Sequence, residues 1–72
     1  MRKINKIKIK INGRNKLLMN GCRLSDLLKN LKTPIKKVAI ELNEEIMDKK
    51  KINQIKLKNN DKIEIVHFIG GG

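Results

Sequence analysis

Aromatic residues, cysteine and histidine are scarce in this chain. Its 72 residues include no Trp or Tyr, one Phe, one Cys and one His. A single Cys cannot form an internal disulfide, and one Cys with one His cannot complete a structural zinc site, so we expect no metal centre. The missing aromatics also remove the stacking platform on which single-stranded nucleic acid is bound. Stability must therefore come from a core built mainly of Ile and Leu.

Long apolar runs are missing as well. No stretch approaches the roughly 20 apolar residues that cross a bilayer, and the basic N-terminus lacks the apolar segment and cleavage site of a signal peptide. A chain this short forms one domain and leaves little room for an enclosed catalytic cleft. We therefore expect a cytoplasmic protein, monomeric when free, with no membrane partner, no bound cofactor and no enzymatic activity of its own.

Charge is plentiful and unevenly spread. The net charge is +11, and residues 1–25 hold eight Lys or Arg and no acidic residue. Such a balance usually points to nucleic acid or another anionic surface. The scarcity of aromatics argues against this, and the abundance of Ile, Lys and Asn matches what A/T-rich codons encode. A basic RNA-binding module is therefore kept only as an alternative of a different class.

The first half of the chain predicts a hairpin and a helix. Residues 6–11 alternate Lys and Ile, which is typical of a half-buried strand, and Asn12-Gly13 is a strong hairpin signal. A second strand should cover residues 14–19. Its register stays open: a two-residue loop turns Lys16 and Leu18 inward, whereas a bulge turns Leu17 and Met19 inward. Residues 1–5 break the alternation and are expected to form a flexible extension.

A helical stripe follows, because Leu24, Leu27, Leu28 and Leu31 recur at helical spacing, and Pro34 is expected to stop the helix. Strands are then predicted over residues 38–42, at Ile46-Met47 and over residues 62–68. The order predicts an α+β domain over residues 6–68, a mixed sheet of four to five strands with one main helix packed across it. The predicted core consists of Ile9, Ile11, Leu24, Leu27, Leu28, Leu31, Ile40, Ile63 and Ile65.

The last strand should present two different faces. Ile63 and Ile65 alternate onto the core side, and His67, on the same side, is expected to close the edge of the core. Val66 and Phe68 alternate onto the opposite side. Exposed apolar pairs often mark contact surfaces, so we interpret these two residues as part of a partner interface. The run Lys49–Lys51 is interpreted as solvated surface, and Cys22 as a packing residue rather than a sulfur relay.

The sequence ends on Ile69-Gly70-Gly71-Gly72. Three glycines offer no side chain to pack and are costly to order, so residues 69–72 are expected to form a thin, flexible arm. Such an arm can deliver the carboxylate of Gly72 into the active site of another protein. The alternative is a frayed terminus of no functional importance.

Several motifs together resemble the ThiS family of thiamin-pathway sulfur carriers, which are ubiquitin-like, β-grasp proteins. They are V-A-I-E-L-N-E-E-I at residues 38–46, N-D-K-I-E-I-V-H-F-I-G-G-G at residues 60–72, L-S-D-L-L at residues 24–28 and I-K-I-N-G at residues 9–13. The resemblance covers nearly everything beyond residue 5.

The resemblance implies a division of labour between this chain and its partners. An E1-like adenylyltransferase using ATP and magnesium would adenylate the Gly72 carboxylate. A sulfur donor of cysteine desulfurase type would convert it to a thiocarboxylate, and thiazole synthase would receive the sulfur. Gly70, Gly71 and Gly72 would be presented to these partners. Carriers for molybdopterin synthesis or tRNA thiolation use the same device and are the nearest alternatives.

Overall fold

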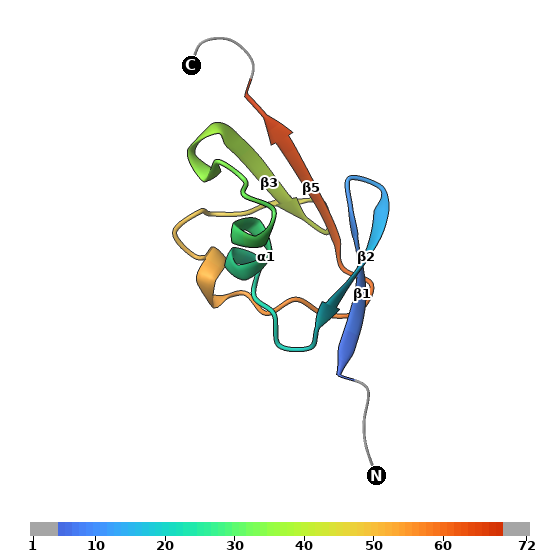
Figure 1. Ribbon diagram of the computed structural model, residues 1–72. Coiled ribbons are helices and arrows are strands. Elements are labelled where there is room, and N and C mark those ends of the chain that lie inside the picture. The colour runs from blue at the N-terminus through green and yellow to red at the C-terminus, as the bar shows by residue number, and fades with distance from the viewer. Residues whose placement is uncertain (1–4, 69–72) are drawn as a thin grey trace.

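The computed structural model describes residues 5–68 and shows one mixed sheet with a helix across one face (Figure 1). This confirms the predicted α+β architecture. The strand order is β2-β1-β5-β3-β4. The elements are β1 (Lys6–Ile11), β2 (Arg14–Met19), α1 (Leu24–Asn30), the 3₁₀ turn η1 (Ile35–Lys37), β3 (Val38–Leu42), β4 (Glu45–Ile46), the 3₁₀ turn η2 (Ile52–Gln54) and β5 (Lys62–His67).

The turn between β1 and β2 sets the register of the first hairpin. Asn12 and Gly13 have φ of 49° and 85°, the left-handed pair that a two-residue hairpin loop requires. Ile9 then lies opposite Lys16. The two-residue alternative is therefore correct, and Lys16 and Leu18 turn toward the helix side of the sheet, which we call the inner face.

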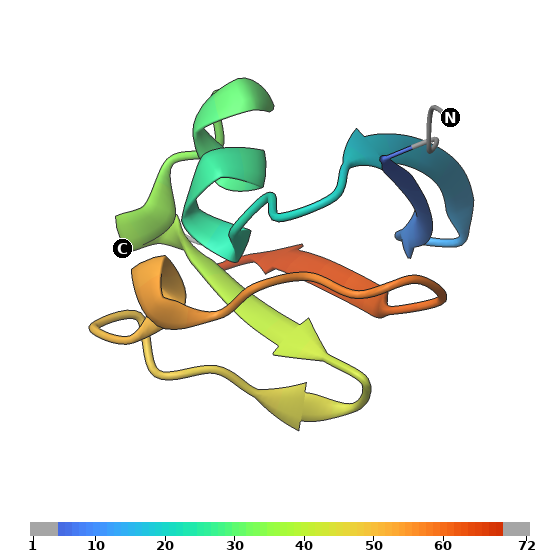
Figure 2. The same ribbon diagram turned by 90° about the horizontal axis from the view of Figure 1, so that it is seen from below.

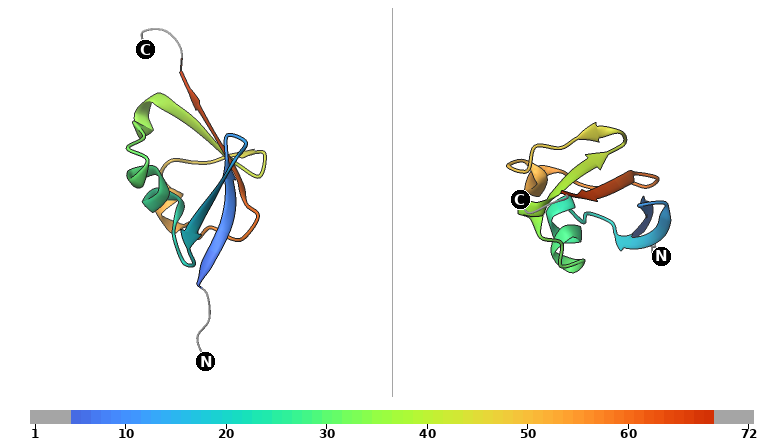
Figure 3. Two further views of the ribbon diagram at one scale, coloured as in Figure 1. Left: turned by 45° about the vertical axis from the view of Figure 1, so that its right-hand side comes forward. Right: turned by 90° about the horizontal axis from the view of Figure 1, so that it is seen from above.

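Strand β5 occupies the centre of the sheet. It runs parallel to β1 and antiparallel to β3, so the end of β5 and the start of β1 lie at opposite ends of the molecule (Figure 3). The first turn fastens onto it: Asn12 donates its backbone N–H to the carbonyl of Ile63 at 2.9 Å. The side-chain oxygen of Asn12 also accepts a hydrogen bond from the N–H of Ile65 at 2.8 Å. Asn12 therefore bonds the central strand through both its backbone and its side chain.

Helix α1 begins without an N-cap side chain of the usual kind. Arg23 occupies the N-cap position and has no acceptor atom to offer the first turn. The Asp26 carboxylate instead accepts a 3.1 Å hydrogen bond from the backbone N–H of Arg23. This is the reverse half of a capping box, and it places a negative charge where the helix dipole favours it.

The end of α1 corrects one prediction, because the helix stops before Pro34 acts on it. Lys32 takes a left-handed conformation with φ of 57°. Its N–H bonds the carbonyl of Lys29, and the N–H of Thr33 bonds the carbonyl of Leu28, both at 3.0 Å. These two bonds form a Schellman motif, which closes the helix by backbone geometry alone.

The core lies between α1 and the inner face. The fully or nearly buried apolar residues are Ile7, Ile9, Leu24, Leu27, Leu28, Val38, Ile40, Ile52, Leu57 and Ile63. Six of the nine predicted core residues are in this group, and Ile11 and Ile65 pack against it. Leu31 was predicted wrongly: it is 38% exposed, because it is the C-cap of a helix that ends at Asn30.

The segment between β4 and β5 has no regular periodicity, yet it completes the core. Ile52 and Leu57 are buried although their surroundings alternate neither as a strand nor as a helix. The segment contacts α1 through η2 (Figure 2). It is fastened to the start of the helix where Leu24 N–H bonds the carbonyl of Ile55 and Leu57 N–H bonds the carbonyl of Cys22, each at 2.9 Å.

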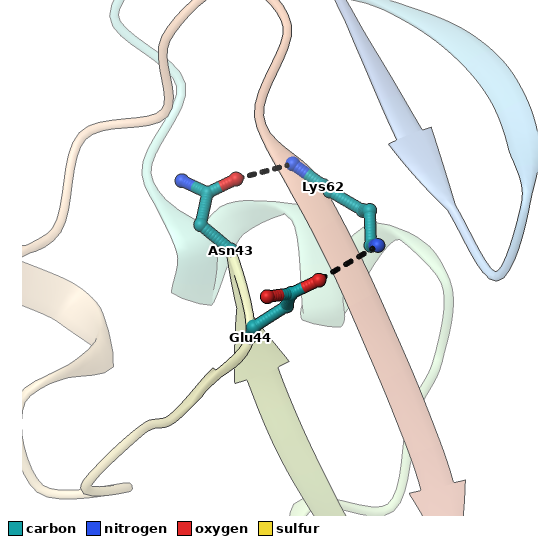
Figure 4. Close-up of polar contacts among 3 residues, drawn as sticks. All are labelled: Asn43, Glu44 and Lys62. Carbon is teal, nitrogen blue, oxygen red and sulfur yellow. Dashed lines mark hydrogen bonds and ion pairs between the residues drawn. The ribbon is translucent and has the colours of Figure 1, made fainter.

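The start of β5 is pinned by polar side chains (Figure 4). Asn43 and Glu44 form the β3–β4 turn with φ of 52° and 73°. The Asn43 side-chain oxygen accepts from the N–H of Lys62 at 2.9 Å, and the Lys62 ammonium pairs with Glu44 at 3.4 Å. The buried carboxylate of Asp61 accepts from the Asn43 amide at 3.0 Å and from the N–H of Lys58 at 2.7 Å. These bonds fix where the central strand begins.

Both ends of the chain bear on predictions that remain open. Asn5 is the one described residue of the predicted extension, and its carbonyl accepts a hydrogen bond from the N–H of Asn20 at 2.6 Å. Residues 1–4 and the predicted arm of residues 69–72 lie outside the described residues. Within residues 5–68, no helix has the length and apolarity needed to cross a membrane.

Candidate functional site

The outer face of β5 carries the residues predicted to contact a partner. Alternation along the strand buries Ile63 completely and leaves Val66 and Phe68 55% and 57% exposed. The prediction that these two side chains are exposed on the face opposite the core is confirmed. Their role in binding a partner stays a prediction.

Neighbouring strands enlarge this apolar surface. Ala39 on β3 lies directly opposite Val66. Glu41 lies two residues after Ala39 on β3 and therefore on the same face. Ile46 on β4 pairs with Glu41, so it belongs to this face as well, and it is 75% exposed. We call Ala39, Ile46, Val66 and Phe68 the outer-face patch. An exposed apolar group of this kind, gathered from three strands, is typical of a surface that another protein covers.

Two carboxylates border the outer-face patch. Glu41 on β3 and Glu64 on β5 are directly opposite each other in the register, and both are partly buried. Like charges facing each other across two strands are unfavourable. Among the described residues, neither takes part in an ion pair within 4 Å. The border of the patch is thus acidic in a chain that is otherwise strongly basic.

Phe68 is held in place although its side chain is exposed. Its backbone N–H donates to the carbonyl of Lys37 at 2.9 Å, which extends the β3–β5 pairing past the end of the strand. The ammonium nitrogen of Lys49 lies 5.1 Å from the centre of the Phe68 ring, within the range of a cation–π interaction. Lys50 and Lys51 are exposed, as predicted for the run Lys49–Lys51, and Lys49 is partly buried.

His67 does not close the core edge as predicted; it is exposed. The reason is that β5 extends beyond α1 (Figure 1), so the helix does not cover the last inward-facing position of the strand. His67 instead lines an open groove of about 570 Å³ with Ile65, Leu31, Arg14 and Lys16 among its neighbours. The groove lies on the inner face, on the opposite side of the sheet from the outer-face patch.

Cys22 has the environment of a packing residue. It is partly buried beside the core, and its thiol makes a 3.5 Å contact with the carbonyl of Arg23. Burial, together with the nearby negative charge of Asp26, raises the pKa of the Cys22 thiol. A raised pKa lowers the thiolate fraction and with it the nucleophilicity that a sulfur relay needs. Among residues 5–68, no three His, Cys, Asp or Glu side chains are grouped so as to hold a metal ion.

The architecture defines the class of protein. A mixed sheet with β5 in the centre, flanked by β1 and β3 and crossed by one helix, is a ubiquitin-like, β-grasp domain. The crystal structure of the thiamine biosynthesis protein ThiS from Geobacter metallireducens has the same arrangement. It matches with a TM-score of 0.80 and 26% identity, over 92% of this chain and 100% of that one. The ThiS family model matches residues 3–72, and the chain belongs to this family.

Two further relatives frame the functional question. The sulfur carrier protein ThiS of Bacillus subtilis is 37% identical over 65 residues, which cover 89% of this chain and 98% of that protein. The thiazole synthase of Paramagnetospirillum magneticum is 39% identical over 66 residues, which cover 92% of this chain but 20% of that protein. The chain therefore spans about a fifth of the thiazole synthases that it matches.

Proposed function

We propose that this chain is a sulfur carrier for the thiazole half of thiamin and that the carboxylate of Gly72 carries the sulfur. The observation that supports this best is the extent of the family match, which runs over residues 3–72 and so includes all three terminal glycines. The near-complete overlap with the Bacillus carrier supports the same conclusion.

The proposed chemistry needs two displacement steps. A carboxylate is a poor electrophile, so an E1-like adenylyltransferase first joins the Gly72 carboxylate to the α-phosphate of ATP–Mg, and pyrophosphate leaves. Hydrosulfide then attacks the acyl carbon, a C–S bond forms, and AMP leaves. Where a cysteine desulfurase-type donor supplies the sulfur as a persulfide, the same attack gives an acyl disulfide, and a reducing thiol then cleaves its S–S bond and is itself oxidised to a disulfide. The product is a thiocarboxylate. ATP, magnesium and the catalytic groups belong to the partners.

Thiazole synthase is the proposed acceptor of the sulfur. In the relatives named thiazole synthase, a segment similar to this chain makes up about a fifth of one long polypeptide. Joining two partners in one chain raises their effective concentration and is advantageous where they act together. We propose that this chain likewise transfers its sulfur to a thiazole synthase.

The outer-face patch is the proposed docking surface for the adenylyltransferase. Val66 and Phe68 would be covered by apolar partner residues, and a basic partner side chain would relieve the unfavourable pair of Glu41 and Glu64. A domain docked in this way holds residues 69–72 near the partner's active site. Glycines suit the approach to that site, because a backbone without Cβ atoms passes through a narrow channel.

Intact-mass measurement tests the proposal directly. The chain is incubated with ATP–Mg, the adenylyltransferase and sulfide, and we expect a mass gain equal to sulfur replacing one oxygen, localised to Gly72. Deletion of Gly72, or addition of an Ala after it, should abolish loading while the circular dichroism spectrum stays unchanged. An extended chain that loads without being trimmed and still supports thiazole formation would show that the reactive group lies elsewhere.

Gly71→Val tests whether close backbone approach is needed. The β-branched side chain should slow loading strongly, while the melting temperature stays the same because the buried core residues all lie between Ile7 and Ile63. Asn53→Val is the matched control, since it adds the same side chain at an exposed position of η2. Equal loading of both variants would argue against a narrow channel.

The same assay separates the neighbouring functions. The loaded carrier is offered to thiazole synthase, to molybdopterin synthase and to a tRNA-thiolating enzyme. Sulfur transfer to thiazole synthase alone is the expected result. Transfer only to one of the others would keep the carrier chemistry but change the pathway.

A further inference from the structure

One edge of the sheet is open and long. Strand β2 pairs with β1 on one side, and no described strand pairs with its other side. It offers six residues, Arg14–Met19, whereas β4 at the opposite edge has only two. The hairpin that contains β2 stands at one side of the sheet, away from β3 and β4 (Figure 2). An unpaired strand of this length is a template for another extended chain.

The register shows which backbone groups face the open edge. In an antiparallel pair, residues that bond their partner alternate with residues that point away from it. The two-residue turn makes Ile11–Arg14 a bonded pair, and the bond from Asn20 N–H to the Asn5 carbonyl continues the same alternation. The N–H groups of Asn15, Leu17 and Met19 therefore point outward, every second residue, as strand addition requires.

Several side chains at the open edge of β2 are apolar, although edge strands normally carry features that prevent pairing with another chain. Leu17 and Met19 are each 62% exposed. A groove of about 310 Å³ separates β2 from α1, with Leu18, Cys22 and Leu27 in its wall. Exposed edges are usually blunted by charge, proline or a bulge, yet Leu17-Leu18-Met19 carries none of these. This end of β2 has the features of a surface that is covered in use.

The charge around the open edge of β2 indicates which kind of partner covers it. Lys6, Lys8 and Lys10 lie opposite Met19, Leu17 and Asn15 on the outer face of β1, and Arg14 and Lys16 belong to β2 itself. The acidic residue at the groove, Asp26, is already bonded to the N–H of Arg23. A second copy of this chain is disfavoured as occupant. Edge pairing would bring together residues 1–25 of two copies, and each of these segments has eight basic residues and no acidic one. An acidic partner is complementary.

We propose that β2 is a docking edge for an extended acidic segment of a partner protein. The segment adds as a sixth strand along Asn15, Leu17 and Met19, and it places apolar side chains in the groove between β2 and α1. Main-chain hydrogen bonds supply affinity and the groove supplies selectivity. This edge is separated from the outer-face patch by β1, so one partner can occupy it while another covers Val66 and Phe68.

A synthetic peptide tests the proposal without knowledge of the natural partner. The probe is a capped peptide in which a short Val-Ile run is flanked on both sides by Glu, titrated into the full chain and followed by NMR. We expect saturable shifts and slowed hydrogen exchange at the amides of Asn15, Leu17 and Met19, with Val66 and Phe68 unchanged. Successive amides of a strand point to opposite sides, so two peptides are compared that are N-methylated at alternate sets of amides. The peptide methylated at the amides that face β2 should not bind, and the peptide methylated at the other set should bind.

Variants of the chain provide the second arm. Leu17→Pro removes an outward N–H without removing a bond to β1, a position where an edge strand accepts proline. We expect at least about tenfold weaker peptide binding, the effect of losing one well-made hydrogen bond with its packing. Leu17→Glu, which keeps the amide but repels an acidic peptide, replaces it if the proline variant does not fold. Ile46→Glu on β4 is the control and should bind normally.

Several outcomes would overturn the proposal. They are the absence of saturable binding, equal binding of both N-methylated peptides, and shifts centred on Val66 and Phe68. Displacement of the peptide by oligouridine of matching charge would assign the edge to nucleic acid instead. Concentration-dependent self-association that Leu17→Glu abolishes would assign it to a second copy of the chain.

Discussion

The side-chain oxygen of Asn12 accepts a 2.8 Å hydrogen bond from the backbone N–H of Ile65, 53 residues further along the chain. Asn12 also adopts the left-handed conformation that the β1–β2 turn needs. One residue therefore shapes the first hairpin and attaches it to the central strand, which leads to Val66, Phe68 and the terminal glycines. The attachment adds to the β1–β5 pairing that places the outer-face patch relative to β1.

Replacing Asn12 with Gly should separate its two roles. Glycine keeps the positive φ but loses the hydrogen bond to Ile65. We expect the free energy of unfolding in urea to fall by about 1 kcal/mol, the net value of one hydrogen bond, and the amide of Ile65 to exchange faster. Asn12→Asp retains an acceptor oxygen and should recover most of the loss. Equal stability of wild type and the glycine variant would mean that the bond contributes nothing.

Replacing Leu28 with Ala should destabilise the domain strongly. Leu28 is completely buried under the helix, and such a truncation costs roughly 2–5 kcal/mol through lost burial and the cavity left behind. That is a large share of the stability of a small domain. Leu17→Ala removes the same atoms from an exposed site and should change the unfolding free energy by less than about 0.5 kcal/mol. Similar losses for both variants would contradict the assignment of the core.

Replacing Phe68 with Ser should affect binding more than stability. The ring is largely exposed, and its contact with Lys49 is worth at most about 1 kcal/mol at such a site. The melting temperature should hardly change, while affinity for the adenylyltransferase, measured by calorimetry, should fall. Met19→Ser is the matched control at the other end of the outer face and should bind that enzyme normally. A large loss of stability with normal binding would mean that Phe68 serves the fold.

The thiol of Cys22 should react slowly with iodoacetamide at neutral pH. Its raised pKa means that the thiolate forms only at higher pH than in a free cysteine peptide. The pH midpoint of the alkylation rate should therefore lie above that of the peptide. Asp26→Asn should lower the midpoint part of the way, since burial is the larger cause and the carboxylate the smaller. Cys22→Ala should load sulfur at the normal rate; loss of loading would revive the relay hypothesis.

The elements predicted correctly depend on short-range patterns. Alternation over residues 6–11 and Asn12-Gly13 predict the first hairpin, because a two-residue turn and its strands are specified within a few neighbours. The leucine stripe predicts α1 for the same reason. The exposure of Val66 and Phe68 follows from the alternation of β5: with Ile63 and Ile65 on the core face, these two residues lie on the opposite face.

The errors arise where one element ends relative to another. Leu31 continues the leucine stripe and His67 continues the inner face of β5, yet both are exposed. The helix has already closed at the Schellman motif of Lys32, and β5 extends past the helix (Figure 1). Periodicity assigns a face to a residue, but burial requires that something lie over that face.

The amino-acid sequence alone determined the fold class, the first hairpin signal, the apolar face of α1 and the glycine ending. The tertiary structure decided the register of β2, the burial of Ile52 and Leu57, the contact of Lys49 with Phe68 and the union of Ile46 with Val66 in one patch. These features join residues far apart in the chain, so no local pattern encodes them. They are chosen when long-range strand pairing brings separate segments together and excludes water from one face of the sheet.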